Sequence, residues 1–156
     1  MRRAEREVNN SAEIENFIAG QKIIRIGFYD EGEVYIVPVN YGHYIENDRY
    51  CFYFHGAKQG RKHDLAEKEP KVGFEIDGCY ELIEAEKACG HSARYMSVTG
   101  SGRLSLIENT EEKIKALDLV MKQATGRTGF EYNETVLERT AVFRLEAEKL
   151  SCKRRK

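Results

Sequence analysis

The alternation of apolar and polar residues at a period of two restricts the fold of this chain more than any other feature. Residues 22–29 place apolar side chains at every second position, a turn follows at residues 30–32, and a second apolar run covers residues 34–41. The alternation returns over residues 94–108. Because successive side chains of a strand point to opposite faces, these segments predict half-buried strands, and the first two form a hairpin.

The remaining segments complete a mainly β (α+β) chain with few helices. Shorter strands are predicted at residues 49–55, 71–77 and 141–147, and helices at residues 10–20, 60–68, 109–126 and 134–139. In the third of these helices, the apolar residues at helical spacing are Ile114, Leu117, Val120, Met121 and Ala124. About six strands at hairpin spacing with so few helices exclude a parallel α/β sheet and predict an antiparallel barrel with peripheral helices.

Some short segments interrupt these regular patterns. A turn is expected at residues 46–48, and residues 78–93 are assigned no structure beyond a helical turn at their middle. The basic residues 151–156 are expected to be a solvated end. Pro38 lies in the middle of the second predicted strand and cannot donate a ladder hydrogen bond, so this strand requires a sheet edge, a bulge or a ligand.

The composition excludes several classes of protein. With 25 Lys and Arg against 26 Asp and Glu, the formal charge is -1, so the chain has no general attraction for nucleic acid or an anionic membrane. No apolar run is long enough to span a bilayer, and the segment MRRAEREVNN has no apolar signal core. The cysteines Cys51, Cys79, Cys89 and Cys152 form no CxxC pair, which indicates reduced thiols. We therefore expect a cytoplasmic protein without disulfides or a metal site.

A cluster of cations follows one of the predicted strands. The stretch FYFHGAKQGRKHDL, residues 52–65, presents Lys58, Arg61 and Lys62 within five positions, near the start of a predicted helix. Three cations beside free helix N–H groups suit a phosphate dianion. Alternatively, they solvate a short surface helix and pair with Asp64 and Glu67. Charge alone does not decide between these interpretations.

The order of several motifs adds a family resemblance. The chain resembles the flavin-binding split-barrel proteins of the pyridoxamine 5'-phosphate oxidase-like superfamily, and most closely its 5-nitroimidazole-resistance branch, in the segments YIVPVNYG (35–42), FYFHGAKQGRKHDL (52–65), PKVGFEID (70–77), RYMSVTGSGRL (94–104) and TAVFRLEAEKLSCKRR (140–155). The resemblance implies a single FMN-binding domain over residues 1–156, folded as a six-stranded antiparallel split β-barrel. It also implies a homodimer with FMN at the subunit interface.

The resemblance assigns cofactor contacts to named residues. The phosphate pair of the family falls on Arg61 and Lys62, and Lys58 takes the place of a third cation. The residues whose backbone would meet the edge of the isoalloxazine ring are Val37, Pro38, Val39, Asn40 and Tyr41. Such a role would explain Pro38, because a position that faces a ligand need not donate to a neighbouring strand.

Three more residues are candidates for the site. Tyr95 and Ser97 lie on the strand that approaches the cofactor of the partner subunit in relatives, although outward polar residues are also ordinary on an antiparallel strand. His55 occupies the position of the active-site histidine in the FH pair of the nitroimidazole-resistance branch. It would contact flavin or substrate as a catalytic residue, or hydrogen-bond a loop carbonyl.

These observations predict an FMN-binding oxidoreductase that reduces a small electron-poor acceptor such as a nitro compound, with NADH or NADPH as a donor. The chain ends in EAEKLSCKRRK rather than in the RLxP-like segment of true pyridoxamine phosphate oxidases, so vitamin B6 oxidation is not expected. One alternative is a non-catalytic module that binds flavin or senses redox state. Another is a split barrel that binds haem or deazaflavin.

Overall fold

The structure is a computed structural model that describes residues 4–46, 49–68 and 70–156. Residues 47 and 48 of the predicted turn lie outside this range. The elements, in chain order, are η1 (Ala4–Arg6), β1 (Glu7–Val8), α1 (Ser11–Gly20), β2 (Ile23–Asp30), β3 (Glu33–Asn40), β4 (Gly42–Glu46), β5 (Arg49–Ala57), α2 (Arg61–Ala66), β6 (Lys71–Ile83), η2 (Ala88–Gly90), β7 (Ser92–Ile107), α3 (Thr110–Thr125), α4 (Glu134–Arg139) and β8 (Thr140–Arg155).

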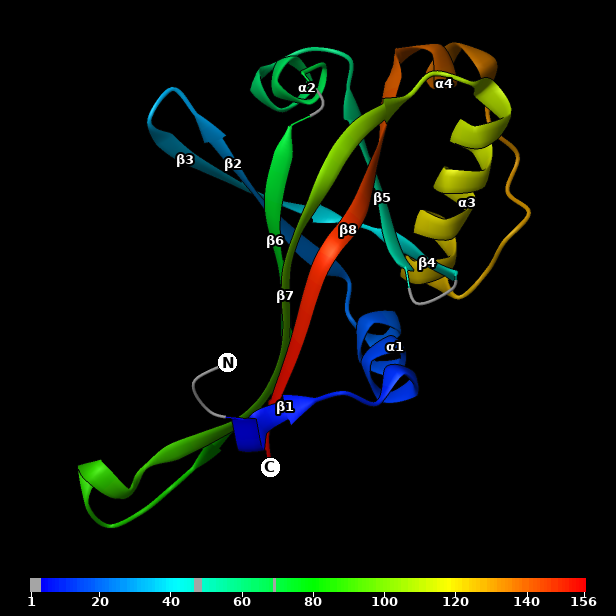
Figure 1. Ribbon diagram of the computed structural model, residues 1–156. Coiled ribbons are helices and arrows are strands. Elements are labelled where there is room, and N and C mark those ends of the chain that lie inside the picture. The colour runs from blue at the N-terminus through cyan, green and yellow to red at the C-terminus, as the bar shows by residue number, and fades with distance from the viewer. Residues whose placement is uncertain (1–3, 47–48, 69) are drawn as a thin grey trace.

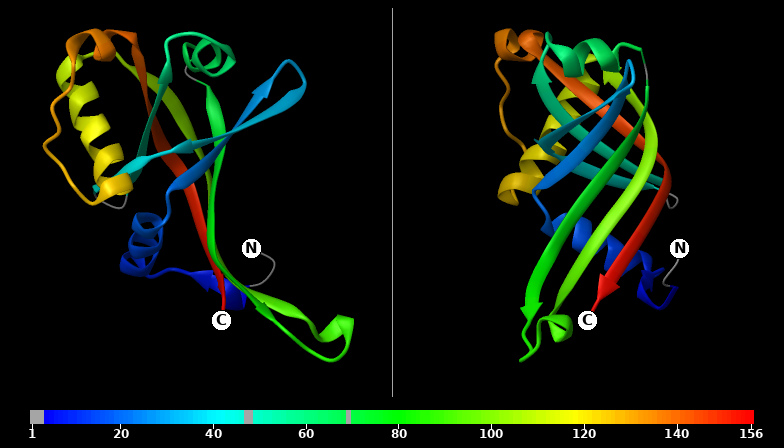
Figure 2. Two further views of the ribbon diagram at one scale, coloured as in Figure 1. Left: turned by 180° about the vertical axis from the view of Figure 1, so that it is seen from behind. Right: turned by 90° about the vertical axis from the view of Figure 1, so that its left-hand side faces the viewer.

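The strands form one curved antiparallel sheet (Figure 1). Their order is β3-β2-β6-β7-β8-β5-β4, and β1 pairs with β8 outside this path. Within the described residues β3 and β4 end the order without pairing to each other, so the sheet is not closed. Figure 2 shows the three long strands β6, β7 and β8 side by side. The predicted class, an antiparallel split barrel with peripheral helices, is confirmed.

The predicted number of six strands was too low. The predicted strand at residues 34–41 corresponds to β3, which pairs with β2. A separate strand, β4, begins at Gly42 and pairs with β5. Gly42, the first residue of β4, allows α3 to approach closely, because a Cβ atom there would lie 2.3 Å from the backbone carbon of Leu119. The two-residue β1 is too short to carry a periodic signal in the sequence.

Half of residues 78–93 also belong to strands, because β6 continues to Ile83 and β7 begins at Ser92. The register of β6 and β7 shifts between Gly78 and Glu81, where Cys79 has a φ of 56°, and the strands then continue as a hairpin that extends beyond the barrel (Figure 1). The irregularity breaks the alternation, which explains why the sequence showed no pattern here. The expected helical turn is present as η2 near the tip.

The expectation of a solvated end at residues 151–156 was wrong. The strand β8 continues to Arg155, paired with β7 on one side and with β1 on the other. Cys152 is 1% exposed and lies opposite Val98. Because Cys152 is the single apolar residue among five polar ones, the segment has no apolar alternation to reveal a strand.

The inward face of the sheet forms the main core, and two predictions about its strands hold. Its most deeply buried sheet residues include Ile24, Ile26, Phe52, Phe54, Ile76, Val98, Leu104, Phe143 and Leu145. The hairpin of β2 and β3 turns at Glu31 and Gly32, both with positive φ. The edge position of β3 satisfies the requirement set by Pro38.

The helices begin where the sequence predicts. The side chains of Asn10 and Asn109 accept hydrogen bonds from the amides of Glu13 and Glu112 and cap α1 and α3. Gly126 ends α3 with a φ of 75°. No helix of the described chain is both long and apolar enough to cross a membrane.

The buried stripe of α3 differs from the prediction. Its buried residues are Lys113, Ala116, Leu117, Val120 and Gln123. Ile114 and Met121 are only partly buried, and Ala124 is exposed. The helix is therefore rotated on the sheet so that two polar side chains, Lys113 and Gln123, face inward.

Gln123 joins α3 to the end of α1. Its Nε2 donates to the carbonyl oxygens of Ile18, Ala19 and Gln21 at 2.8, 3.1 and 2.7 Å. Its Oε1 lies 3.0 Å from Nδ1 of His43. These bonds supply donors to carbonyl groups that the end of a helix leaves unpaired, so they fix α1 against α3.

Candidate functional site

The connection from β5 to α2 places the predicted cations at one end of the barrel. Gly60 has a φ of 97°, a conformation that favours glycine, and α2 begins at the next residue, Arg61. Leu65 and Ala66 on α2 are buried against the main core. Burial of this short helix fixes the positions of Arg61 and Lys62 relative to the barrel (Figure 1).

Arg61 contacts the hairpin of β2 and β3. Its Nε donates to Oδ2 of Asp30 at 2.9 Å, and its Nη2 donates to Oε2 of Glu33 at 3.4 Å. Its guanidinium carbon lies 4.8 Å from the ring centroid of Tyr35. The hydrogen bond to Asp30 is the largest influence that raises the pKa of Arg61. A guanidinium has more N–H donors than these two contacts use, so Arg61 can also donate to an anion.

Lys62 lies at the inward face of β5. Its Nζ donates to the carbonyl oxygen of His55 at 3.4 Å and lies 5.7 and 5.1 Å from the ring centroids of Phe54 and Phe143. Gly56 leaves room for it, because a Cβ atom there would lie 2.7 Å from this Nζ. Partial burial lowers the pKa of Lys62, so its ammonium would gain from an anionic partner.

The three predicted cations do not all lie together in the structure. Burial lowers the pKa of Lys113 on α3, and the charge of Lys58 lowers that pKa further. The expected pairing of the cations with Asp64 and Glu67 is also not found in the described chain, where these carboxylates lie next to His63. Arg61 and Lys62 share α2, whereas Lys58 faces α3.

His55 lies on the face of β5 that α3 covers. It lines a cavity of about 200 Å³ together with Leu117, Val120, Met121, Tyr132, Asn133, Val136, Leu137 and Thr140. Burial lowers the pKa of His55, and the ammonium of Lys62 lowers it further. A neutral imidazole at the wall of an apolar cavity can exchange a proton with a bound molecule near neutral pH.

The predicted flavin-lining strand is β3, at the edge of the sheet. Val37 and Val39 pack against the core, whereas Pro38 and Asn40 are exposed on the other face. Because β3 pairs only with β2 among the described strands, backbone groups on its free side are available to a ligand. The side chain of Tyr41 is 1% exposed, and its hydroxyl donates to the carbonyl oxygen of Ile18 at 2.6 Å. Only the backbone of Tyr41 could therefore meet a ring at this edge.

Tyr95 and Ser97 lie far from the cations of their own chain. Both belong to the first half of β7, whose beginning lies at the opposite end of the sheet from α2 in Figures 1 and 2. The hydroxyl of Tyr95 accepts from Nη1 of Arg6 at 3.3 Å, and Ser97 lies opposite Lys153 on β8. Within one chain these residues do not join the site at α2.

A second hollow lies on the outer face of β4, β5 and β8. Its volume is about 1040 Å³, and its lining mixes three arginines with three glutamates: Arg49, Arg103, Arg144, Glu46, Glu146 and Glu148. None of the predicted site residues lines it. The balanced charges of this hollow indicate no preference for an anion or a cation.

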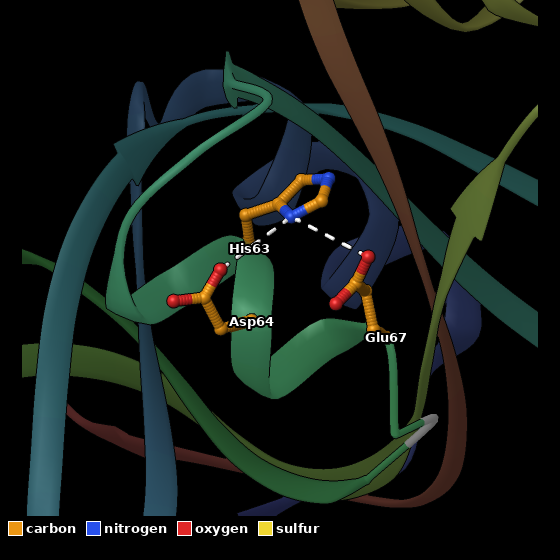
Figure 3. A group of neighbouring side chains, drawn as sticks. All are labelled: His63, Asp64 and Glu67. Carbon is orange, nitrogen blue, oxygen red and sulfur yellow. Dashed lines mark ion pairs between the residues drawn. The ribbon is translucent and has the colours of Figure 1, made fainter.

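One group of metal-ligand side chains occurs among the described residues, on α2 and at the residue that follows it (Figure 3). Nδ1 of His63 lies 3.8 Å from Oδ1 of Asp64 and 4.0 Å from Oε1 of Glu67. The carboxylate side chains are 69% and 61% exposed. A structural zinc site closes with four ligands, and this group offers three from one short helix, so we assign no metal to it.

Lys113 was missed at the sequence level. Its 6% exposure is unusual for lysine, which is rarely buried without a partner. The available signal was its spacing, because Lys113 stands four positions before Leu117, on the same face of α3. Because the neighbouring Ile114 also fits an apolar stripe at helical spacing, the sequence did not show that Lys113 lies on the buried face.

Two comparisons with known sequences give different results. A family model described as pyridoxamine 5'-phosphate oxidase matches residues 10–154 of this chain. No curated protein sequence shows significant similarity to this chain. The family match extends from α1 to Arg154 in β8, and thus covers every predicted site residue.

Several solved structures share the fold. A candidate 5-nitroimidazole antibiotic resistance protein from Bacteroides thetaiotaomicron is 27% identical, with a TM-score of 0.80 over 94% of this chain and 85% of that one. The flavocytochrome Anf3 from Azotobacter vinelandii is 21% identical, with a TM-score of 0.77 over 96% and 69%. An FAD and heme binding protein from Mycobacterium smegmatis is 15% identical, with a TM-score of 0.80 over 97% and 74%.

Proposed function

Because this chain belongs to the pyridoxamine 5'-phosphate oxidase family, we propose that it is an FMN-binding oxidoreductase that reduces a small electron-poor acceptor, such as a nitro compound. The observation that carries the proposal is the pair Arg61 and Lys62, held at the end of the barrel by a short helix that Leu65 and Ala66 anchor in the core, with N–H donors left for a phosphate. The similarity to a candidate 5-nitroimidazole resistance protein supports the choice of acceptor.

The edge strand β3 supports the placement of the flavin ring. A flat ring beside β3 would receive hydrogen bonds from those backbone groups of residues 37–41 that point away from β2, which on an antiparallel edge strand are the groups of every second residue. Pro38 has no N–H group, and at the free side of an edge strand this removes no hydrogen bond between strands. The bound flavin would supply the redox chemistry, while the protein would neutralise the phosphate and orient the ring.

We propose that a second copy of the chain completes each site. Tyr95 and Ser97 lie too far along the sheet from α2 to meet a flavin held by their own Arg61 and Lys62 (Figure 1). In a homodimer with two equivalent interfaces they would reach the flavin of the partner.

The free thiols of all four cysteines suit a reducing compartment such as the cytoplasm.

His55 connects the cofactor segment to a space for the acceptor. Its carbonyl oxygen accepts from Lys62, and its imidazole lines the cavity of about 200 Å³. An acceptor in this cavity would find one titratable side chain among mostly apolar walls, and His55 would donate or withhold a proton there. NADH or NADPH would provide the electrons to the flavin.

One alternative has specific support. Structures that share this fold include a flavocytochrome and an FAD and heme binding protein, so haem or FAD is the alternative cofactor. A non-catalytic module would bind flavin in the same place but would transfer no electrons from NADH or NADPH.

The visible spectrum and mass of the molecule that copurifies with the protein test the proposal. We expect flavin bands and the mass of FMN, no Soret band, and bleaching by NADH or NADPH followed by reoxidation on addition of a nitroaromatic compound. Riboflavin should bind at least about tenfold more weakly than FMN, because it lacks the phosphate that Arg61 and Lys62 would hold. Equal binding of riboflavin, or purified protein that binds no flavin at all, would contradict the proposal.

A further inference from the structure

Large apolar side chains are exposed on two parts of the sheet. Of the eight that are exposed in the described chain, six lie on the hairpin of β2 and β3 or on the extension of β6 and β7 beyond the barrel, and these six are Ile23, Tyr29, Val34, Ile36, Tyr80 and Leu82. Their exposed fractions are 45, 75, 70, 60, 73 and 49%. Because soluble monomers rarely expose large apolar patches, both parts of the sheet indicate contact with another molecule.

On the hairpin, exposed side chains gather on the outer face near the turn. Tyr29 lies opposite Val34, and Ile36 lies opposite Gly27. Gly27 in turn lies opposite Gly73 on β6, so two adjacent positions beside Ile36 have no side chain and another molecule can approach the sheet closely there. We call this surface the hairpin patch, and it consists of Tyr29, Val34, Ile36 and the exposed Pro38.

The extension of β6 and β7, residues 79–93, has one apolar and one charged face, and we call it the arm. Leu82 lies opposite Ala93, and Tyr80 stands two residues before Leu82 on the same face of β6. Glu81 and Arg94 lie opposite each other on the other face, where Nη1 of Arg94 donates to Oε1 of Glu81 at 2.7 Å. The charged groups of the arm thus pair on one face and leave the other face apolar and exposed.

The arm and the hairpin patch lie at opposite ends of one side of the molecule, as the arm, in green, and the β2–β3 hairpin show in Figures 1 and 2. They are therefore too far apart to cover each other within one chain. A twofold axis through the middle of this side exchanges its two ends. It would bring the arm of each copy onto the hairpin patch of the other, in two identical contacts.

The exposed area is sufficient for such a contact. Large apolar side chains present on the order of 150–200 Å² each when fully exposed, so the exposed parts of Tyr29, Val34, Ile36, Tyr80 and Leu82 amount to roughly 600 Å² in each copy. A standard stable interface buries about 800 Å² per partner. The five side chains thus supply most of this area, and Pro38, Ala93 and polar neighbours at the rim supply the rest.

We propose that the arm of one copy of this chain packs against the hairpin patch of a second copy, and that the second arm makes the same contact in return. The partner is a second copy because each chain carries both surfaces, at the two positions that a twofold axis exchanges.

The contact would also bring two parts of the predicted site together. Tyr95 follows Ala93 by two residues on the same face of β7, at the base of the arm. The hairpin that receives the arm holds Arg61 through Asp30. A docked arm would therefore carry Tyr95 toward the cation pair of the other copy. That this completes a flavin site rests on the proposed function, whereas the contact between arm and hairpin patch does not.

Sedimentation equilibrium of the full chain without flavin measures the contact. We expect a dimer of about twice 18.0 kDa. Leu82→Lys and Ile36→Glu should each raise the dissociation constant of the dimer at least about a hundredfold, because each places an unpaired charge in both contacts. The control Val136→Glu changes an apolar side chain that is 61% exposed on α4, and it should dimerise like wild type.

A mixture of the two variants tests which surfaces meet. In a mixed dimer, one contact contains both opposite charges, and the other contact keeps its original apolar side chains. The mixture should therefore dimerise at concentrations where each variant alone is monomeric. Absence of this recovery would overturn the pairing of arm and hairpin patch. Tyr80→Lys and Val34→Glu provide the same test at neighbouring positions if either first variant does not fold.

The remaining outcomes separate this contact from the proposed function. A wild-type chain that is monomeric with and without FMN, or variants that dimerise as wild type does, would overturn the contact whether or not flavin binds. If wild type dimerises, the variants are monomeric and no flavin binds to either, the contact is supported and the proposed function fails. If the monomeric variants lose FMN together with the dimer, both are supported.

Discussion

The substitution Lys62→Met removes one charge and little else from the proposed phosphate site. Methionine has a similar length and can keep the packing over Phe54 and Phe143, whose ring centroids lie 5.7 and 5.1 Å from Nζ. The single hydrogen bond lost within the chain, at 3.4 Å to the carbonyl oxygen of His55, is long. The free energy of unfolding without cofactor should therefore change by less than about 1 kcal/mol.

The effect on FMN should be much larger. A hydrogen bond to a charged partner contributes about 1.5–3 kcal/mol, which corresponds to a change in dissociation constant of roughly tenfold to a hundredfold. Because Lys62 is partly desolvated, its contact with phosphate is screened less than a contact at the exposed Arg61 would be. Riboflavin has no phosphate, so its affinity should not change.

A second effect of Lys62→Met needs no cofactor. The ammonium of Lys62 lowers the pKa of His55, so its removal should raise that pKa toward the ordinary value. Titration of the imidazole by NMR would show this shift, and quenching of flavin fluorescence would give both dissociation constants. Lys68→Met, which removes a charge just after α2, is the matched control. Equal loss of FMN and riboflavin affinity, or an unmoved His55 titration, would refute this account of Lys62.

Four further predictions concern the stability of the fold, its assembly and the role of His55. Gln123→Leu should lower the free energy of unfolding by about 1–3 kcal/mol, measured by urea denaturation, since the carbonyl groups of Ala19 and Gln21 lose their donor while that of Ile18 keeps the hydroxyl of Tyr41; a loss below about 0.5 kcal/mol would show that this joint is dispensable. Burial lowers the pKa of His43 in the folded state, so its contribution to stability is present above the unfolded pKa of about 6.5 and is lost as the pH falls below it; the decline from pH 7 to 5 should be smaller in His43→Asn, and an identical slope would contradict this role. Light scattering of the flavin-loaded protein should give about twice 18.0 kDa, and a monomer that retains flavin would contradict the shared site. His55→Ala should keep FMN but change the rate of reoxidation by a nitroaromatic acceptor by about tenfold or more in stopped-flow experiments, whereas an unchanged rate and pH profile would leave His55 a structural residue.

Much of the fold could be predicted because its signals are local. The caps at Asn10 and Asn109 and the end of α3 at Gly126 lie where short-range patterns indicate them. The hairpin of β2 and β3 follows from alternation and a turn within a few residues. The segment that carries Arg61 and Lys62 was also found from the sequence, because its charges are adjacent along the chain and match a family motif.

The sequence by itself determined which residues form strands wherever one face is buried, because the side-chain period of two then produces an alternation of apolar and polar residues. It could not determine the strand at residues 151–155, where pairing with β7 and β1 holds a polar segment in place. Only the tertiary structure decided that Arg61 contacts Asp30 across the hairpin and that Lys113 lies on the buried face of α3. Such contacts depend on the curvature of the sheet and on the rotation of α3 upon it, and these result from the packing of many side chains together rather than from any local pattern.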